Sequence, residues 1–272
     1  MSTAVSPEME TLKTRLKTIW EAGDFTEVAK HIETVADQFV ERLDIKPGMK
    51  VLDVACGSGN LAIIAAQKGA DVTGIDIADN LVEAAKQRAE RLGLNIKFEQ
   101  GDAEDMPYSD GEFDLVMTMF GAMFAPRPDV TASELVRVTK PGATIAMANW
   151  TPTGFAGQMF KLSGKYVPPP PMPPPVLWGV PDEVAARFGD SVEDLRMSPQ
   201  LADMIFEFGP ADVAEFFKTY FGPTVMAMKA MGEDNHEAFT NDLVEIWTAN
   251  NTKSDGMTLV KSEYLEVVAK KK

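Results

Sequence analysis

Cysteine and histidine are almost absent from this chain of 272 residues, which contains one Cys and two His. A single Cys excludes an internal disulfide and any zinc or iron–sulfur centre that needs several thiolates. His31 and His236 lie far apart in the sequence, so we expect no histidine-ligated metal either. The sequence therefore predicts no bound metal and a fold that depends on its hydrophobic core.

Basic residues and long hydrophobic runs are also scarce. Lys and Arg number 26 against 41 Asp and Glu, and the net charge of −15 argues against nucleic acid as a partner, because it would repel a phosphate backbone. The longest uncharged apolar run, 115–125, has 11 residues, whereas a membrane-spanning helix needs about 20. The opening sequence MSTAVSPEME lacks the basic and apolar layout of a signal peptide. We expect a cytoplasmic protein without a membrane span.

Hydrophobic residues make up 45% of the chain, which is enough to build a core. The length suits one large domain, or one domain with an insertion. Apolar residues at helical spacing predict a first helix through Leu12 and Trp20 and a second, continuous helix from Val28 to Leu43. Asp24 follows the break between them and is expected to cap the second helix.

The segment from residue 49 to 150 alternates short apolar runs with helical patterns. Its predicted strands lie at 50–55, 71–76, 95–99, 113–118 and 142–149, and its helices near 60–68, 79–92 and 129–139. This alternation is typical of βαβ units, and therefore of an α/β fold with a parallel sheet. Later in the chain we expect strands near 201–208 and 257–268 and helices near 211–221 and 235–250. The two later strands would complete a seven-stranded sheet.

A proline-rich stretch separates these two sections. Residues 168–175 read PPPPMPPP and hold seven of the eighteen prolines. Such a run adopts extended polyproline geometry and forms neither a helix nor a central strand. It is expected to be either a stiff surface linker or one wall of a lid.

A glycine loop follows the first predicted strand, in VLDVACGSGNLAIIAA. Gly57 and Gly59 allow a ligand to approach the backbone closely, and with Ala62 they fit the G-x-G-x-x-A pattern of nucleotide-binding loops. Asp76, at the end of the second strand, is placed to accept hydrogen bonds from two ribose hydroxyls. Nicotinamide dinucleotides and S-adenosylmethionine both carry such a ribose, so the loop alone leaves both ligands open.

Acidic residues at two further strand ends favour a ligand with a positive charge. Asp53, at the end of the first strand, could hold an ammonium group, whereas it would repel the pyrophosphate of a dinucleotide. Asp102 follows the third strand and could accept a hydrogen bond from an adenine amino group. Open α/β sheets bind ligands at the carboxyl ends of their strands, so these side chains would share one cleft. This pattern suits a cationic nucleoside.

In these motifs the chain resembles the class I S-adenosylmethionine-dependent methyltransferases, and most closely the ubiquinone/menaquinone-biosynthesis-like branch. The resemblance covers about 100 residues and is carried by VLDVACGSG (51–59), VTGIDI (72–77), QGDAEDMPYSDGEFDLVM (100–117) and ELVRVTKPGATIAM (134–147). One departure is Ala55, which replaces the first glycine of the family's loop.

The resemblance implies a Rossmann-like three-layer sandwich with a seven-stranded, mostly parallel sheet. Together with the shift in composition after Trp150, it suggests an N-terminal helical cap, an S-adenosylmethionine-binding core, a proline-rich lid inserted after the fifth strand, and a C-terminal part that completes the sheet. The corresponding residues are 1–44, 45–150, 151–200 and 201–272.

The resemblance also implies a role for individual residues in binding S-adenosylmethionine, whose product is S-adenosylhomocysteine. Asp53 and the backbone of Ala55, Gly57 and Gly59 would hold the methionine part, with Met119 beside it. The loop residue Cys56 is expected to be a small packing residue next to the cofactor. The ribose and adenine contacts would come from Asp76, Ile77, Asp102 and Ala103.

The flanks would choose the acceptor, and their aromatic residues favour a small apolar or aromatic molecule. The expected pocket consists of Trp20, Phe25, Phe120, Met123, Trp150 and Trp178, and Phe124 belongs to the same aromatic set. In-line methyl transfer needs alignment and exclusion of water, and a general base only if the acceptor must lose a proton. His31 and Asp24 are the candidates for a base, but a surface histidine and a helix cap are the simpler interpretations of these two residues.

Two other functions remain open from the sequence. A NAD(P)-dependent oxidoreductase or epimerase fits the glycine loop and Asp76, although the chain has no Tyr-x-x-x-Lys pair. A non-catalytic module that binds the nucleoside and a partner protein fits the same residues. The methylated atom and the oligomeric state are not determined by the sequence.

Overall fold

A single seven-stranded sheet organises residues 6–272, the part of the chain that the computed structural model describes. In chain order the strands are β1 (Lys50–Val54), β2 (Asp71–Asp76), β3 (Lys97–Gln100), β4 (Phe113–Met119), β5 (Thr139–Trp150), β6 (Val192–Phe206) and β7 (Thr258–Lys271). Their order across the sheet is β3-β2-β1-β4-β5-β7-β6. The first five strands pair in parallel, whereas β7 runs antiparallel to both β5 and β6. The predicted fold class is confirmed.

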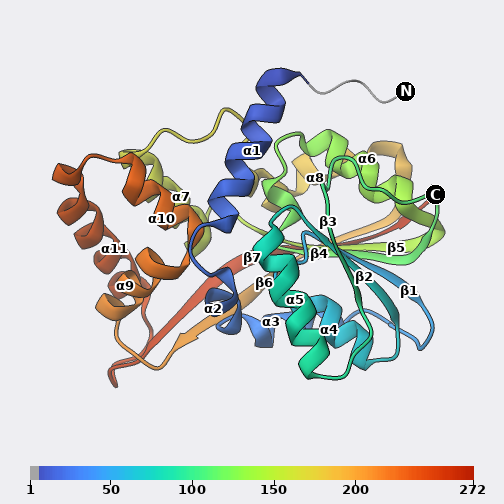
Figure 1. Ribbon diagram of the computed structural model, residues 1–272, viewed down its shortest axis with the longest axis horizontal. Coiled ribbons are helices and arrows are strands. Elements are labelled where there is room, and N and C mark those ends of the chain that lie inside the picture. The colour runs from blue at the N-terminus through green and yellow to red at the C-terminus, as the bar shows by residue number, and fades with distance from the viewer. Residues whose placement is uncertain (1–5) are drawn as a thin grey trace.

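Helices cover both faces of the sheet, which makes the three layers. Those between the parallel strands are α4 (Asn60–Gln67), α5 (Asp79–Arg91) and α6 (Pro128–Val138), and they agree with the predicted helices to within two residues at either end. Figure 1 shows α3 (Glu33–Glu41) and α4 on one side of the sheet, with α6 and α8 (Pro181–Phe188) on the other. The central strands read as continuous apolar runs because both of their faces are covered; in β1 every residue after Lys50 is buried.

A second group of helices stands beside the β6–β7 end of the sheet, at the left of Figure 1. Its members are α7 (Phe155–Tyr166), α9 (Pro210–Tyr220), α10 (Gly222–Ala230) and α11 (His236–Asn250). They pack around the fully buried Trp247, whose ring centroid lies 4.5 Å from that of Phe155 and 4.9 Å from that of Phe217. The group contacts α1 (Pro7–Glu21) through α10. The sequence predicted α9 and α11, but not α7, α8 or α10.

The predicted continuous helix from Val28 to Leu43 is wrong, because the chain forms two helices there. α2 (Phe25–Lys30) ends at His31, and α3 begins after Ile32. The ring of His31 is turned toward β6: its Nδ1 lies 2.6 Å from the carbonyl oxygen of Ile205, and the ring stacks on Phe206. The break turns α2 toward the carboxyl ends of the strands, while α3 packs on the sheet.

β6 begins at Val192, well before the predicted start near residue 201. The sequence missed its first half because this half is mostly exposed and carries the charged residues Glu193, Asp194 and Arg196. Pro199 also lies in this half, and it is tolerated because β6 is an edge strand, where a missing N–H costs little. Much of the stretch 151–200 is therefore regular structure, and the division into four parts stays a prediction.

The proline-rich stretch leads into a short 3₁₀ turn, η2 (Pro175–Gly179), which inserts Trp178 into the core. Gly179 is required there, since a β-carbon at this position would lie 2.3 Å from the carbonyl oxygen of Trp150. None of the helices within residues 6–272 combines the length and the apolar character needed to cross a membrane.

Candidate cofactor and acceptor cleft

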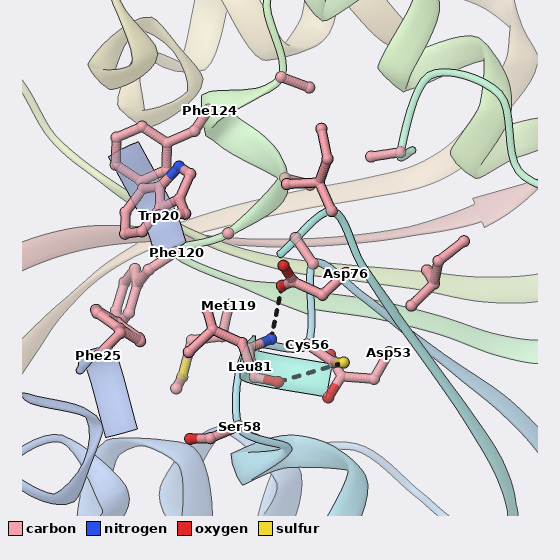
Figure 2. A pocket seen from close by; sticks show the side chains of 18 of the residues that line it. Trp20, Phe25, Asp53, Cys56, Ser58, Asp76, Leu81, Met119, Phe120 and Phe124 are labelled. Carbon is pink, nitrogen blue, oxygen red and sulfur yellow. Dashed lines mark hydrogen bonds between the residues drawn. The ribbon is translucent and has the colours of Figure 1, made fainter. Parts of the chain in front are cut away.

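A cleft opens at the carboxyl ends of β1, β2 and β4, where α1 and α2 cover it. The cleft and the solvent-filled opening above it together enclose about 1060 Å³. Acidic side chains and the glycine loop form one end and aromatic side chains the other, and Figure 2 shows the two groups apart, with Met119 and Leu81 between them. The sequence predicted that these strand ends would meet, and the geometry brings most of the predicted residues together.

Asp76 organises the glycine loop. Its Oδ2 accepts a hydrogen bond of 2.8 Å from the backbone N–H of Gly57, and its Oδ1 accepts one of 2.9 Å from Ala78. Burial raises the pKa of Asp76 above its usual range, although the hydrogen bonds from backbone N–H groups oppose the shift. Gly57 has a φ of +53°, a conformation that favours glycine, and it faces the cleft with only Phe25 nearby. The loop is thus shaped to let a ligand approach its backbone.

Asp53 lies deeper, at the end of β1, and is 1% exposed. Its Oδ2 accepts a hydrogen bond of 3.0 Å from the N–H of Ala62 in the first turn of α4. Burial raises the pKa of Asp53 well above its usual range, and the charge of Asp76 adds to the shift. Two neighbouring carboxylates with little water gain from a ligand that brings positive charge.

Ala55, the departure from the family's glycine, adopts the backbone conformation that a glycine would favour. Its φ is +55°, and Phe120, which follows β4, has a φ of +58°. Between them the backbones approach so closely that a β-carbon on Gly121 would lie 2.4 Å from the carbonyl oxygen of Ala55. Strained residues of this kind cluster at functional sites. Gly121 was not among the predicted site residues, and the geometry shows that it is required there.

Asp102 and Ala103 also line the cleft, together with a lysine that sequence reasoning missed. The Nζ of Lys13, on α1, lies 2.5 Å from Asp102 Oδ2 and 2.7 Å from Glu104 Oε2. Burial alone would lower the pKa of Lys13, but the hydrogen bonds and charges of these two carboxylates raise it. Among the described residues that line the cleft, Lys13 is the only cationic one.

The aromatic end of the cleft is built on Trp20. Its ring centroid lies 4.8 Å from that of Phe124 and 5.6 Å from that of Phe25. Phe120 lines the cleft beside them and is supported from behind by Trp150, which stacks on it with centroids 3.5 Å apart. Trp150, Met123 and Trp178 are themselves buried and do not line the cleft. Of the predicted pocket, Trp20, Phe25 and Phe120 meet at one place, together with Phe124.

The remaining predicted residues take different positions. Ile77, Met119 and Cys56 line the cleft, and burial raises the pKa of the Cys56 thiol well above its usual value. Gly59 is the residue before α4. It packs against the ring of Phe98 and does not line the cleft. The two candidate bases do not line it.

Asp24 caps α2, where it accepts a hydrogen bond of 3.0 Å from Thr26, and His31 faces β6. Within residues 6–272 no group of three or more His, Cys, Asp or Glu side chains is arranged to hold a metal.

Comparison with known proteins relates this cleft to a family. Residues 45–167 match a family model described as a methyltransferase domain. An uncharacterised protein of Mycobacterium tuberculosis is 35% identical to this chain over 97% of each. The methyltransferase GfsG of Streptomyces halstedii is 38% identical over 43% of each chain. Among solved structures, phosphoethanolamine N-methyltransferase 2 of Haemonchus contortus, crystallised with S-adenosylmethionine, has a TM-score of 0.57 at 16% identity and covers 88% of this chain and 52% of its own.

The strand order, the glycine loop and the acidic strand ends together define the class I methyltransferase architecture. The chain belongs to the S-adenosylmethionine-dependent methyltransferases of this class, and it shares a family with the mycobacterial protein over nearly its whole length. Its cofactor is S-adenosylmethionine. Membership of the ubiquinone/menaquinone-biosynthesis-like branch stays a prediction.

Proposed function

We propose that this methyltransferase acts on a small apolar or aromatic acceptor by in-line methyl transfer. The observation that supports this proposal is the separation of the cleft into a carboxylate end and an aromatic end, with Met119 between them (Figure 2). An aromatic wall gains most from an apolar ligand, because such a ligand loses little hydration on binding.

The residues at the carboxylate end fit the cofactor in shape and in charge. We propose that Asp53 and the backbone of Ala55 and Gly57 hold the methionine part, with Cys56 packed beside them, and that Gly59 supports this loop from below. Asp76 would take the ribose, and the adenine would lie against Ile77, Asp102 and Ala103. When bound, the cofactor supplies a methyl group on a positively charged sulfur, and the C–S electron pair leaves with that sulfur.

The aromatic end would align the acceptor and exclude water. Phe120 is held rigidly between the cleft and Trp150, and Trp20 with Phe124 closes the opposite side. Alignment of this kind converts a bimolecular reaction into an effectively intramolecular one, which accounts for a large part of the barrier that such enzymes lower. We assign no base, since His31 and Asp24 stand outside the cleft.

The test combines cofactor binding with product analysis. Calorimetry is expected to show binding of S-adenosylhomocysteine and none of NAD. A panel of small aromatic and apolar thiols, phenols and amines, incubated with S-adenosylmethionine, should give a product heavier by one methylene group. Binding of NAD in place of S-adenosylhomocysteine would favour the oxidoreductase alternative. Cofactor binding with no product from any acceptor would favour a non-catalytic module.

Asp76→Ala gives the sharpest check of the ribose assignment. Loss of the charge-assisted hydrogen bonds should weaken cofactor binding by about 1.5–3 kcal/mol. The matched control is Asp71→Ala, at the exposed opposite end of the same strand, which should bind as the wild type does. Unchanged affinity in Asp76→Ala would contradict the assignment.

A further inference from the structure

One helix, α1, contributes to both ends of the cleft. Lys13, Leu16 and Trp20 line it, and their spacing of three and four residues puts them on a single helix face. Lys13 reaches the carboxylate end through Asp102, whereas Trp20 stands among the aromatic side chains at the other end. The position of α1 therefore affects the two ends together.

The N-terminal half of α1 is held by a buried ion-pair network. Lys13 bridges Asp102 and Glu104, and the Glu104 side chain has no exposure to solvent. Glu104 also pairs with Arg127 at 2.7 Å, just before α6. Because little water reaches these charges, breaking one of the pairs leaves the others uncompensated. Lys17, one turn further along α1, pairs with Asp79 and Glu21, but these pairs are more exposed and contribute less.

The C-terminal end of α1 is fixed in another way, by close backbone packing. A β-carbon on Gly222, at the start of α10, would lie 2.1 Å from the carbonyl oxygen of Ile19. The rest of the helix depends less on packing, since Leu12 and Leu16 are buried but do not belong to the contiguous core. The helix is thus anchored at Ile19, near its C-terminal end, and held by Lys13 near its middle.

We propose that Lys13 is a positioning residue through which bound cofactor seats α1 and so completes the aromatic end of the cleft before the acceptor binds. The inference rests on the proposed function, in which Asp102 contacts the adenine. A carboxylate offers about four lone-pair sites, and Asp102 uses one oxygen for the N–H of Glu104 and the other for Lys13. A further donor from the cofactor can therefore share this carboxylate with Lys13.

The coupling follows from where the contacts lie. Cofactor at Asp102 covers the part of this carboxylate that is still exposed, and it touches the face of α1 that lines the cleft. Because a ligand can make these contacts only when α1 is seated, its binding raises the fraction of molecules in which α1 is seated. Trp20 lies next to the anchor at Ile19, so that a rotation of α1 about this anchor turns the Trp20 ring within the cleft. A ligand bound at the carboxylate end thereby orders the acceptor end.

The test uses S-adenosylhomocysteine and needs no acceptor. Affinity is measured by calorimetry, and the position of α1 by the change in tryptophan fluorescence when S-adenosylhomocysteine binds. The contribution of Trp20 is the part of this fluorescence change that is lost in Trp20→Phe. Lys13→Met keeps the apolar stem of the side chain and removes the charge. It should bind about tenfold more weakly and lose more than half of the Trp20 change at saturation. Lys17→Met, one turn further along the helix, should behave as the wild type does, and Lys13→Arg should restore most of both effects.

Full wild-type affinity and a full Trp20 change in Lys13→Met would overturn the inference, as would equal losses in Lys13→Met and Lys17→Met. Should Lys13→Met fail to fold, hydrogen exchange in the wild type decides. The amides of α1 should exchange more slowly with S-adenosylhomocysteine bound, and unchanged exchange would contradict the coupling. A wild-type protein that binds no S-adenosylhomocysteine would instead contradict the proposed function on which the inference rests.

Discussion

Asp53 is a buried acidic side chain with one backbone hydrogen bond and a second carboxylate nearby. Its raised pKa means that the folded protein holds this proton more tightly than the unfolded chain does. Such a group contributes stability below its unfolded pKa, and this contribution is lost as the pH rises through the folded pKa. At neutral pH Asp53 therefore destabilises the cofactor-free protein, because it must carry a buried charge or keep a proton that the unfolded chain releases.

Asp53→Asn should stabilise the cofactor-free protein at pH 7 and weaken its cofactor binding. The amide oxygen can still accept the hydrogen bond from Ala62, and the side chain no longer has an ionisation that burial opposes. We expect thermal unfolding about 2–4 °C above that of the wild type, the scale of ~1 kcal/mol in a protein of this size. The gain should shrink as the pH falls toward 4. A gain that grows on acidification would contradict this account, and Asp71→Asn serves as the exposed control.

Ala55→Gly tests the backbone strain in the cofactor loop. A non-glycine residue in the left-handed region costs about 1–2 kcal/mol. Substitution by glycine removes this cost, but it also raises the entropy of the unfolded chain, which offsets part of the gain in stability. The free energy of unfolding, measured with urea, should rise by about 0.5–1 kcal/mol. Ala66→Gly, within α4, should lower it by a similar amount. A loss of stability in Ala55→Gly would show that the loop is relaxed with alanine.

The positions of single residues were predictable where the strand pattern brings them to one edge of the sheet. Asp53 and Asp76 lie at the ends of β1 and β2, and Asp102 follows β3. Because the ends of parallel strands meet at the same edge, the proximity of these residues follows from the strand pattern alone. Lys13 was not predictable, because its partner Asp102 lies 89 positions away and a lysine on an amphipathic helix resembles any solvated charge. Trp150 was expected in the pocket, but it packs behind Phe120. The prediction was wrong because a strand pattern does not say which of two stacked rings faces the cleft.

At the scale of elements, the contact between α1 and α10 depends on a residue without a side chain. Gly222→Ala would place a β-carbon 2.1 Å from the carbonyl oxygen of Ile19, and the helices would have to separate. We expect a loss of about 1–3 kcal/mol in the free energy of unfolding. Gly164→Ala, in the open part of α7, should instead raise it by about 0.5–1 kcal/mol. Equal effects of the two substitutions would contradict the close packing.

The elements that the sequence predicted best are the apolar strands and the helices between them, from β1 to β5. The helix break at His31 and Ile32 has no glycine or proline to mark it, because its cause is a long-range contact with β6. The first half of β6 was missed for a related reason: an edge strand needs little apolar character, and its charged residues resemble a loop. In both cases a partner distant in the sequence decided the local structure.

At the scale of the whole molecule, the net charge of −15 acts on a cofactor whose own net charge is positive. S-adenosylmethionine carries a sulfonium and an ammonium against one carboxylate, whereas S-adenosylhomocysteine lacks the sulfonium. Salt screens this attraction. Between about 20 and 300 mM NaCl, the affinity for S-adenosylmethionine should fall ~2–5-fold and that for S-adenosylhomocysteine much less. Equal salt dependence of the two in calorimetry would show that the field of the protein does not contribute.

The place of β7 has a consequence for the way this protein is made. On the ribosome, β5 and β6 emerge long before β7, yet β7 lies between them and pairs with both. The parallel strands can assemble on the nascent chain, but the other half of the sheet must wait for the last strand of the sequence. A truncated mRNA that ends before the codon for residue 258 would yield a chain in which the edges of β5 and β6 that normally pair with β7 are open. Open strand edges invite aggregation. Cellular quality control, rather than a partial loss of activity, would decide the fate of such a product.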